Sequence, residues 1–208
     1  MPALAKPFPT WLARSRAWVS IILLAPAGLA VIFSAPALAI NSWEDVLCNA
    51  FGWTLFFAGA TFRWWATLYI GGNKDQKVVD QGAYSVTRNP LYFGTFLLVI
   101  AIAVLLQSVV FVVATLFVCV YYLGVTVPVE EGRLEVLYGD DYVRYCQRVP
   151  RFWPKFSLYK SPPLIEVRVP GLRAEAFRAL RWAMIPIVCQ TITHLRAQDW
   201  WPHWANLP

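Results

Sequence analysis

The chain has 208 residues, of which 58% are hydrophobic and only 14% are charged, and its mean hydropathy is +0.49. A soluble domain normally carries nearer a quarter charged residues, so this composition favours a membrane protein without a separate soluble domain. The net charge of +6 comes without a basic run inside a recognisable binding module. Attraction to anionic lipid therefore explains it, and nucleic-acid binding is not expected.

Four apolar stretches are long enough, or nearly so, to cross the roughly 20-residue hydrocarbon core of a bilayer. They cover about residues 18–40, 46–70, 91–106 and 109–127. Only Gln107 and Ser108 separate the third stretch from the fourth, which leaves room for a tight turn between antiparallel helices. The sequence predicts an all-α, polytopic membrane protein with about four transmembrane helices, the third and fourth forming a hairpin.

The first stretch ends in Pro36-Ala-Leu-Ala39, which looks like a signal-peptidase site after a basic start. However, its basic leader is long and its apolar run exceeds that of an ordinary signal peptide. We expect an uncleaved first span, with cleavage as the open alternative.

Lysine and arginine are distributed unevenly along the chain. Three precede the first stretch, none lies between the first and second, and three (Lys74, Lys77 and Arg88) lie between the second and third. Eleven more follow Pro128. Because basic segments stay in the cytoplasm, four spans with both termini and the loop around residue 88 in the cytoplasm fit this pattern.

The character of the chain changes after Pro154, so we expect a membrane domain over 1–154 and a tail over 155–208. Residues 172 to about 196 have helical periodicity with arginines on one side, and Pro186 interrupts their short apolar core. This pattern predicts a basic amphipathic helix lying in the cytoplasmic membrane interface.

The cysteines and histidines show no spacing of a ligand set. The four cysteines form no CxxC pair, and both histidines lie near the C-terminal end without a neighbouring cysteine or carboxylate cluster. We expect free thiols and no metal site.

A polar triplet, Arg88-Asn89-Pro90, stands directly before the third stretch. Asparagine as the N-cap and proline at the first helical position are common at helix starts, so two of the three need no functional explanation. Arg88 at the positive end of a helix dipole is less expected. The free backbone N–H groups and the guanidinium together predict a site for an anion such as a carboxylate.

Two adjacent carboxylates, Glu130 and Glu131, follow the fourth stretch. Acidic residues favour the first turn of a helix, but a pair at an anionic membrane surface is poorly placed unless it faces a cation. The hairpin would return this pair to the face that carries Arg88 and Asn89. S-adenosylmethionine fits such paired charges, and so does a phospholipid headgroup.

Three ordered motifs between residues 52 and 154 carry a family resemblance. They read Gly59-Ala-Thr-Phe-Arg-Trp-Trp-Ala66, then Gly82-Ala-Tyr-Ser-Val-Thr-Arg-Asn-Pro-Leu-Tyr-Phe-Gly94, then Glu130-Glu131-x-x-Leu134 with Tyr138–Tyr145 and Arg148–Pro154. The chain resembles the superfamily of isoprenylcysteine carboxyl methyltransferases and phospholipid methyltransferases. These are integral-membrane enzymes that use S-adenosylmethionine, which implies a lipid or another lipophilic acceptor.

The resemblance implies a set of cofactor-binding residues: Gln76, Lys77, Val78, Val79, Tyr84, Asn89, Pro90, Leu91, Tyr92 and Glu130. Two positions depart from the family pattern. Asn89 stands where histidine is frequent, and Thr126 stands where the isoprenylcysteine enzymes have an arginine that meets the substrate. The second departure leaves the acceptor open.

Four residues are candidates for catalysis or for contact with the acceptor. Arg88 would hold an anion, and Glu131 would be the nearest base if the acceptor arrives as an ammonium ion. Thr126 and Arg63 are candidates for binding the acceptor. Arg63 lies within the second span, where a charge is costly, so it either snorkels to the surface or faces the bundle interior.

Two other functions stay open at this point. A membrane sterol-type reductase using NADPH is similar in its C-terminal half, but a glutamate that is frequent in those chains falls where this one has Phe93-Gly94-Thr95. A non-catalytic scaffold of the same fold would have no use for Arg88 beside paired carboxylates. The oligomeric state cannot be inferred.

Overall fold

The computed structural model describes residues 10–70, 77–165, 167 and 169–204. These residues form helices and connecting loops without a β-strand, which confirms the all-α class. The long helices are α1 (Thr10–Ile32), α2 (Trp43–Ile70), α4 (Pro90–Leu105), α5 (Val109–Tyr121), α6 (Val127–Tyr138) and α8 (Val169–Arg196). The short helices are α3 (Ala83–Val86) and α7 (Asp140–Arg148).

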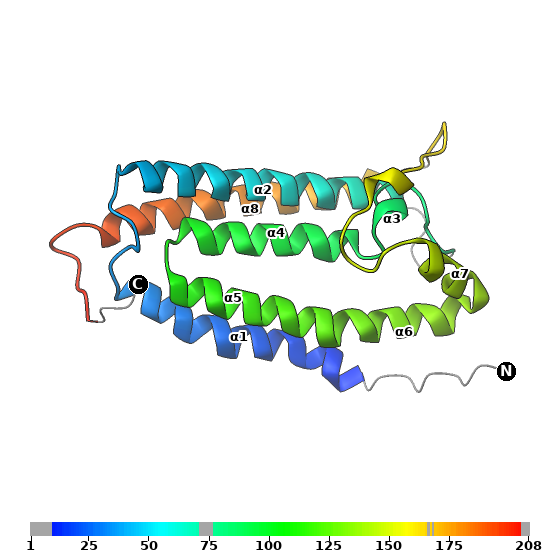
Figure 1. Ribbon diagram of the computed structural model, residues 1–208, viewed down its shortest axis with the longest axis horizontal. Helices are drawn as coiled ribbons and strands as arrows, with labels where there is room; N and C mark the ends of the chain where they lie inside the picture. The colour runs from blue at the N-terminus through cyan, green and yellow to red at the C-terminus, as the bar shows by residue number, and fades with distance from the viewer. Residues whose placement is uncertain (1–9, 71–76, 166, 168, 205–208) are drawn as a thin grey trace.

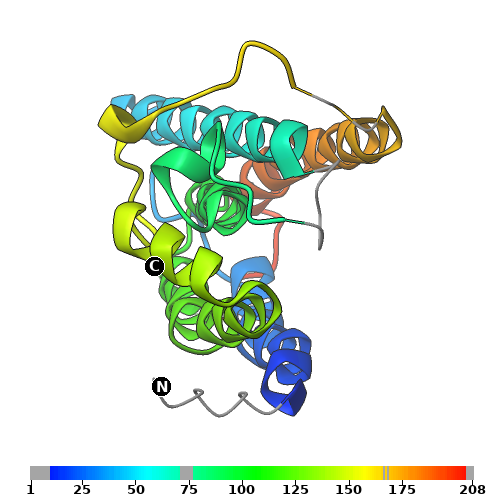
Figure 2. The same ribbon diagram turned by 90° about the vertical axis from the view of Figure 1, so that its right-hand side faces the viewer.

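The long helices lie along the long axis of the molecule in two layers (Figures 1 and 2). One layer contains α2, α4 and α8, and the other contains α1 and α5 with its continuation α6. The short helices α3 and α7 gather at one end of the bundle, which we call the α7 end (Figure 1). Thr10 also lies toward this end, whereas Trp204 lies at the opposite end, where it stacks on Phe33.

Helices α2 and α4 approach each other closely through two glycines. A Cβ atom added at Gly59 would lie 2.7 Å from the carbonyl oxygen of Gly94, and one at Gly94 would lie 2.8 Å from the carbonyl oxygen of Gly59. Small residues at such a crossing are typical of helix packing in membranes, where close backbone contact replaces the hydrophobic driving force.

The hairpin between α4 and α5 has the tight turn that the sequence predicts. Gln107 has a φ of 47°, and the Ser108 hydroxyl caps α5 by accepting a hydrogen bond from the backbone N–H of Phe111. A π-helical turn, Tyr122–Thr126, then joins α5 to α6 directly before Pro128. Within the described residues, one helix, Val109–Tyr138, is long and apolar enough to cross a membrane by length and composition.

Two expected boundaries differ in the structure. The first helix ends at Ile32 instead of near Ile40, because Pro36 disfavours a helical conformation in the residue before it. The expectation of an interfacial C-terminal helix is wrong, because α8 packs lengthwise against α2 and α4 (Figure 1). Its buried side, including Pro186 and Cys189, faces these helices.

Arg196, the last residue of α8, fastens this helix to the end of the bundle opposite α7. Its guanidinium is fully buried and donates hydrogen bonds to the carbonyl oxygens of Ser34 (2.9 Å), Ala35 (2.9 Å) and Leu106 (2.7 Å). These acceptors belong to the chain after α1 and to the end of α4. One side chain therefore ties α8 to both layers.

Replacing Arg196 by leucine is expected to lower the free energy of unfolding by about 3–5 kcal/mol, because three buried carbonyls lose their donor. The measurement is thermal or detergent-induced unfolding of the purified protein, followed by circular dichroism. His194→Ala, an exposed change on the last turns of the same helix, is the control and should leave the midpoint unchanged. An unaltered midpoint in Arg196→Leu would contradict this account of α8.

Candidate active site

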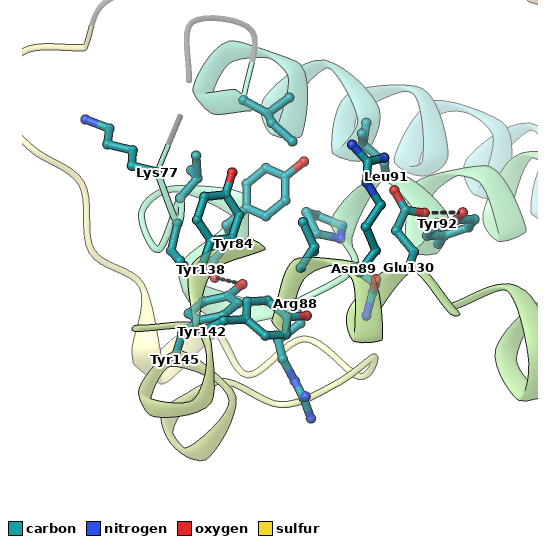
Figure 3. Close-up of a pocket in the computed structure, with 16 residues that line it drawn as sticks. Lys77, Tyr84, Arg88, Asn89, Leu91, Tyr92, Glu130, Tyr138, Tyr142 and Tyr145 are labelled. Carbon is teal, nitrogen blue, oxygen red and sulfur yellow. Dashed lines mark hydrogen bonds between the residues drawn. The ribbon is translucent and has the colours of Figure 1, made fainter. Parts of the chain in front are cut away.

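A cavity of about 160 Å³ lies at the α7 end of the bundle (Figure 3). The end of α2, the start of α4, and helices α6 and α7 surround it, together with the chain before α3. Its lining consists of Ile70, Lys77, Val78, Val79, Tyr84, Arg88, Asn89, Pro90, Leu91, Tyr92, Glu130, Arg133, Leu134, Tyr138, Tyr142 and Tyr145. Lys77, Glu130 and Arg133 are exposed, so the cavity opens to solvent.

A glycine sets the course of the chain into this cavity. Gly82 has a φ of 58°, and a Cβ atom there would lie 2.2 Å from the ring of Tyr69. Only glycine fits both the left-handed backbone and the aromatic contact. The turn leads into α3, which carries Tyr84 to the cavity wall.

The start of α4 combines an expected backbone with an unexpected side-chain role. Asn89 is the N-cap residue and Pro90 the first helical residue, as the sequence predicts. The Asn89 side chain makes no capping bond, however. Its amide donates to Glu131 Oε1 (2.9 Å) and to the carbonyl oxygen of Arg151 (2.9 Å), which joins the helix start to α6 and to the chain after α7.

The two adjacent glutamates have different surroundings. Glu130 lines the cavity and accepts a hydrogen bond from the hydroxyl of Tyr92 at 2.6 Å (Figure 3). Glu131 is buried and is not among the cavity-lining residues. Its carboxylate pairs with Arg151 Nε at 2.9 Å and with Arg88 Nη1 at 3.6 Å. The structure therefore does not bring the expected base to the cavity.

Arg88 keeps one donor available beside the cavity. Its Nε–H is buried and has no hydrogen-bond partner among the described residues, although the guanidinium pairs with Glu131. A buried donor without a partner costs about 1–3 kcal/mol. An anionic group bound next to Arg88 would remove this cost.

Tyrosines from α3, α6 and α7 form an aromatic wall of the cavity (Figure 3). Tyr145 donates a hydrogen bond to the carbonyl oxygen of Tyr84 at 2.9 Å, which fixes α7 against α3. Burial raises the pKa of Tyr84, Tyr142 and Tyr145 above the ordinary value of a phenol, and the negative charge of Glu130 adds to the effect on Tyr84. The wall therefore stays neutral at physiological pH.

These three phenols are expected to stay protonated in the folded protein as the pH rises past about 10, the ordinary tyrosine value. They ionise more easily in the unfolded chain, so their contribution to stability is complete below that pH and is lost as the pH rises above it. Ultraviolet titration should show fewer than the nine tyrosines ionising before alkaline unfolding. Ionisation of all nine near pH 10 with the fold intact would contradict this assignment.

The structure brings most of the expected cofactor-binding residues to one place. Lys77, Val78, Val79, Tyr84, Asn89, Pro90, Leu91, Tyr92 and Glu130 all line the cavity, as does Arg88. Gln76 lies outside the described residues. The sequence analysis did not assign Tyr138, Tyr142 or Tyr145 to the site, although the buried pair on the amphipathic helix α7 was a usable signal.

The two expected acceptor-binding residues do not line the cavity. Arg63 faces the bundle interior, where its Nε donates to Glu175 of α8 at 2.9 Å and its Nη1 donates to Thr95 at 2.7 Å. Thr126, the last residue of the π-helical turn, is buried, and its hydroxyl has no hydrogen-bond partner among the described residues.

No group of three or more potential metal ligands from histidine, cysteine, aspartate and glutamate occurs in the described part of the chain.

Comparison with known proteins places the residues of this cavity within a family. Residues 47–141 match the family model described as phospholipid methyltransferase. The nickel-cobalt-cadmium resistance protein NccN of Alcaligenes xylosoxydans xylosoxydans is 26% identical over 100% of this chain and 97% of its own length. The cobalt-zinc-cadmium resistance protein CzcN of Cupriavidus metallidurans is 28% identical over 62% of this chain and 59% of its own length.

A third relative is named for its enzymatic activity. Protein-S-isoprenylcysteine O-methyltransferase B of Arabidopsis thaliana is 27% identical over 59% of this chain and 65% of its own length. No solved structure matches the chain significantly. Most of the cavity lining falls within the residues that match the family model. The chain belongs to the superfamily of phospholipid methyltransferases and isoprenylcysteine carboxyl methyltransferases.

Proposed function

We propose that this protein is an integral-membrane methyltransferase that uses S-adenosylmethionine and methylates a lipophilic or membrane-associated acceptor. The observation that carries the proposal is the cavity at the start of α4, where Arg88 and Glu130 offer opposite charges beside a wall of tyrosines. Bound S-adenosylmethionine would supply an electrophilic methyl group on its sulfonium.

The residues of the cavity suit the charges of this cofactor. Arg88 and the first backbone N–H groups of α4 would hold its carboxylate, which would give the buried Nε–H of Arg88 a partner. Glu130 would hold its positive groups, with Tyr92 fixing the carboxylate in place. The neutral tyrosines of α7 would offer apolar faces to the adenine ring.

Glu131 has a supporting role in this proposal. Its carboxylate neutralises Arg151 and part of Arg88, and it accepts a hydrogen bond from Asn89. It would therefore hold the start of α4 in position and would not remove a proton from the acceptor. Methyl transfer depends mainly on orienting and desolvating the nucleophile, so it does not require a dedicated base for an acceptor that arrives ionised.

The distribution of charge favours a cytoplasmic α7 end. Basic residues gather there on several elements: Lys77, Arg88, Arg151, Lys155, Lys160, Arg173, Arg178 and Arg181. Glu44, Asp45 and Asp199 lie near the opposite end. By the positive-inside rule, the cofactor would reach the cavity from the cytosol.

This placement makes α8 a fifth helix across the membrane, in addition to the four expected spans. Its lengthwise packing and the anchoring of Arg196 beside Ser34 support that reading. Thr10 and Trp204 would then lie on opposite sides, in place of the expected arrangement with both termini in the cytoplasm.

The family membership favours methyl transfer over the reductase and scaffold alternatives. The acceptor can be sought by incubating the purified protein with methyl-labelled S-adenosylmethionine and membrane lipid extracts. Label is expected in a lipid-soluble product. Label that appears only in water-soluble products would contradict a lipophilic acceptor, and a Glu130→Ala sample serves as the background control.

A further inference from the structure

A narrow crevice between α2 and α8 carries charged residues that the cavity does not use. It is lined by Phe56, Ala60, Arg63, Trp64, Leu98, Glu175, Arg178, Ala179 and Trp182, none of which lines the proposed cofactor cavity. Glu175 lies at its centre and pairs with Arg63 from α2 and with Arg178 from its own helix.

The charges of this cluster do not balance. The Glu175 side chain is only 4% exposed, so its single negative charge is committed to two arginines. Arg63 is 15% exposed and also donates to Thr95, whereas Arg178 is 45% exposed. The cluster therefore has a net charge of about +1, and its accessible part is the guanidinium of Arg178 at the mouth of the crevice.

The surroundings of Arg178 resemble the headgroup level of a membrane helix. Arg173 and Arg181 are also exposed on the first half of α8, and Trp64 is 42% exposed on the neighbouring helix. Farther along α8 the exposed side chains become apolar, with Met184, Ile187 and Val188 each about half exposed. Arginines and tryptophans followed by an apolar band are typical of a helix that leaves the headgroup region for the hydrocarbon.

We propose that the mouth of this crevice binds the phosphate of an anionic phospholipid from the cytoplasmic leaflet, at a site separate from the methyl acceptor. The proposal rests on the membrane placement of α8 given above. The exposed face beside the crevice is apolar, so lipid is the neighbour there, and an anionic headgroup complements the excess positive charge. Basic pockets between transmembrane helices bind such headgroups.

The dimensions fix where the headgroup would lie. The crevice itself encloses only about 10 Å³, enough for about one water molecule. The phosphate would therefore lie across the mouth, against Arg178 and Arg181, while Arg63 and Glu175 hold the two helices together beneath it. Trp64 and Trp182 would flank the glycerol region.

Native mass spectrometry of the full-length protein in detergent, titrated with phosphatidylglycerol, tests the proposal. The Arg178→Gln variant is expected to bind the first lipid at least fivefold more weakly than the parent protein. Arg144→Gln, which removes an exposed arginine on α7 outside both sites, is the matched control and should bind as the parent does. Arg178→Lys keeps the charge and should lose less affinity than the glutamine variant.

Further arms separate the alternatives. Phosphatidylcholine and inorganic phosphate should not displace the bound phosphatidylglycerol. Equal affinity of Arg178→Gln and the parent protein, or equal binding of both lipids, would overturn the proposal. S-adenosylmethionine affinity, measured on the same samples, should be unchanged in Arg178→Gln, so failure of the lipid site and failure of the proposed function remain distinguishable.

Discussion

Replacing Glu130 by alanine is expected to lower the affinity for S-adenosylmethionine at least tenfold, a loss of about 1.4 kcal/mol or more in binding free energy. Among the described residues that line the cavity, Glu130 is the only carboxylate, and the hydroxyl of Tyr92 holds it at 2.6 Å. Its removal would leave the positive groups of the cofactor without a counter-charge. Equilibrium binding to the detergent-purified variant measures this effect.

The fold of this variant should survive, because Glu130 is exposed and makes no buried ion pair. Glu135→Ala is the matched control, since Glu135 is an exposed glutamate on the same helix outside the cavity. It should bind the cofactor as the parent protein does. If Glu130→Ala and Glu135→Ala both retain full affinity, the cofactor does not bind where we place it.

The neighbouring substitution, Glu131→Ala, is expected to act mainly on stability. It removes a buried carboxylate that pairs with Arg88 and Arg151 and accepts a hydrogen bond from Asn89. Breaking a buried pair from one side costs about 3–5 kcal/mol, and the partial exposure of Arg151 places this case near the lower figure. Thermal unfolding in detergent measures the loss, again with Glu135→Ala as control.

Glu131→Gln separates a positioning role from a role as the base. If Glu131 positions the start of α4, stability and cofactor affinity fall together, and the pH dependence of methyl transfer keeps its shape. If Glu131 is the base, methyl transfer is lost while stability and cofactor affinity stay at the parent level. The second outcome would contradict the orientation that the structure gives to this carboxylate.

The opposite orientations of the two glutamates could have been predicted from helix geometry. Adjacent residues on an α-helix point about 100° apart, so Glu130 and Glu131 cannot both face one cavity. The sequence did not show which of them turns inward, because that depends on Asn89 and Arg151, which approach from other elements.

The position of α8 was the least predictable part of the fold. Arg173, Arg178, Arg181 and Pro186 lower its apolar character, so sequence patterns indicate an interfacial helix. The structure offsets these costs through tertiary contacts: Glu175 pairs with Arg63, and Arg196 donates to backbone carbonyls of both layers. The hairpin at Gln107 and the Asn89-Pro90 helix start depend on local sequence, and both were predicted.

The central claim is that the cavity at the start of α4 binds S-adenosylmethionine. The most direct measurement is a calorimetric titration of the purified protein with S-adenosylmethionine and, separately, with NADPH. The account predicts saturable binding of S-adenosylmethionine by the parent protein, at least tenfold weaker binding by Glu130→Ala, and no binding of NADPH. Binding of NADPH alone, or of neither compound, would contradict it.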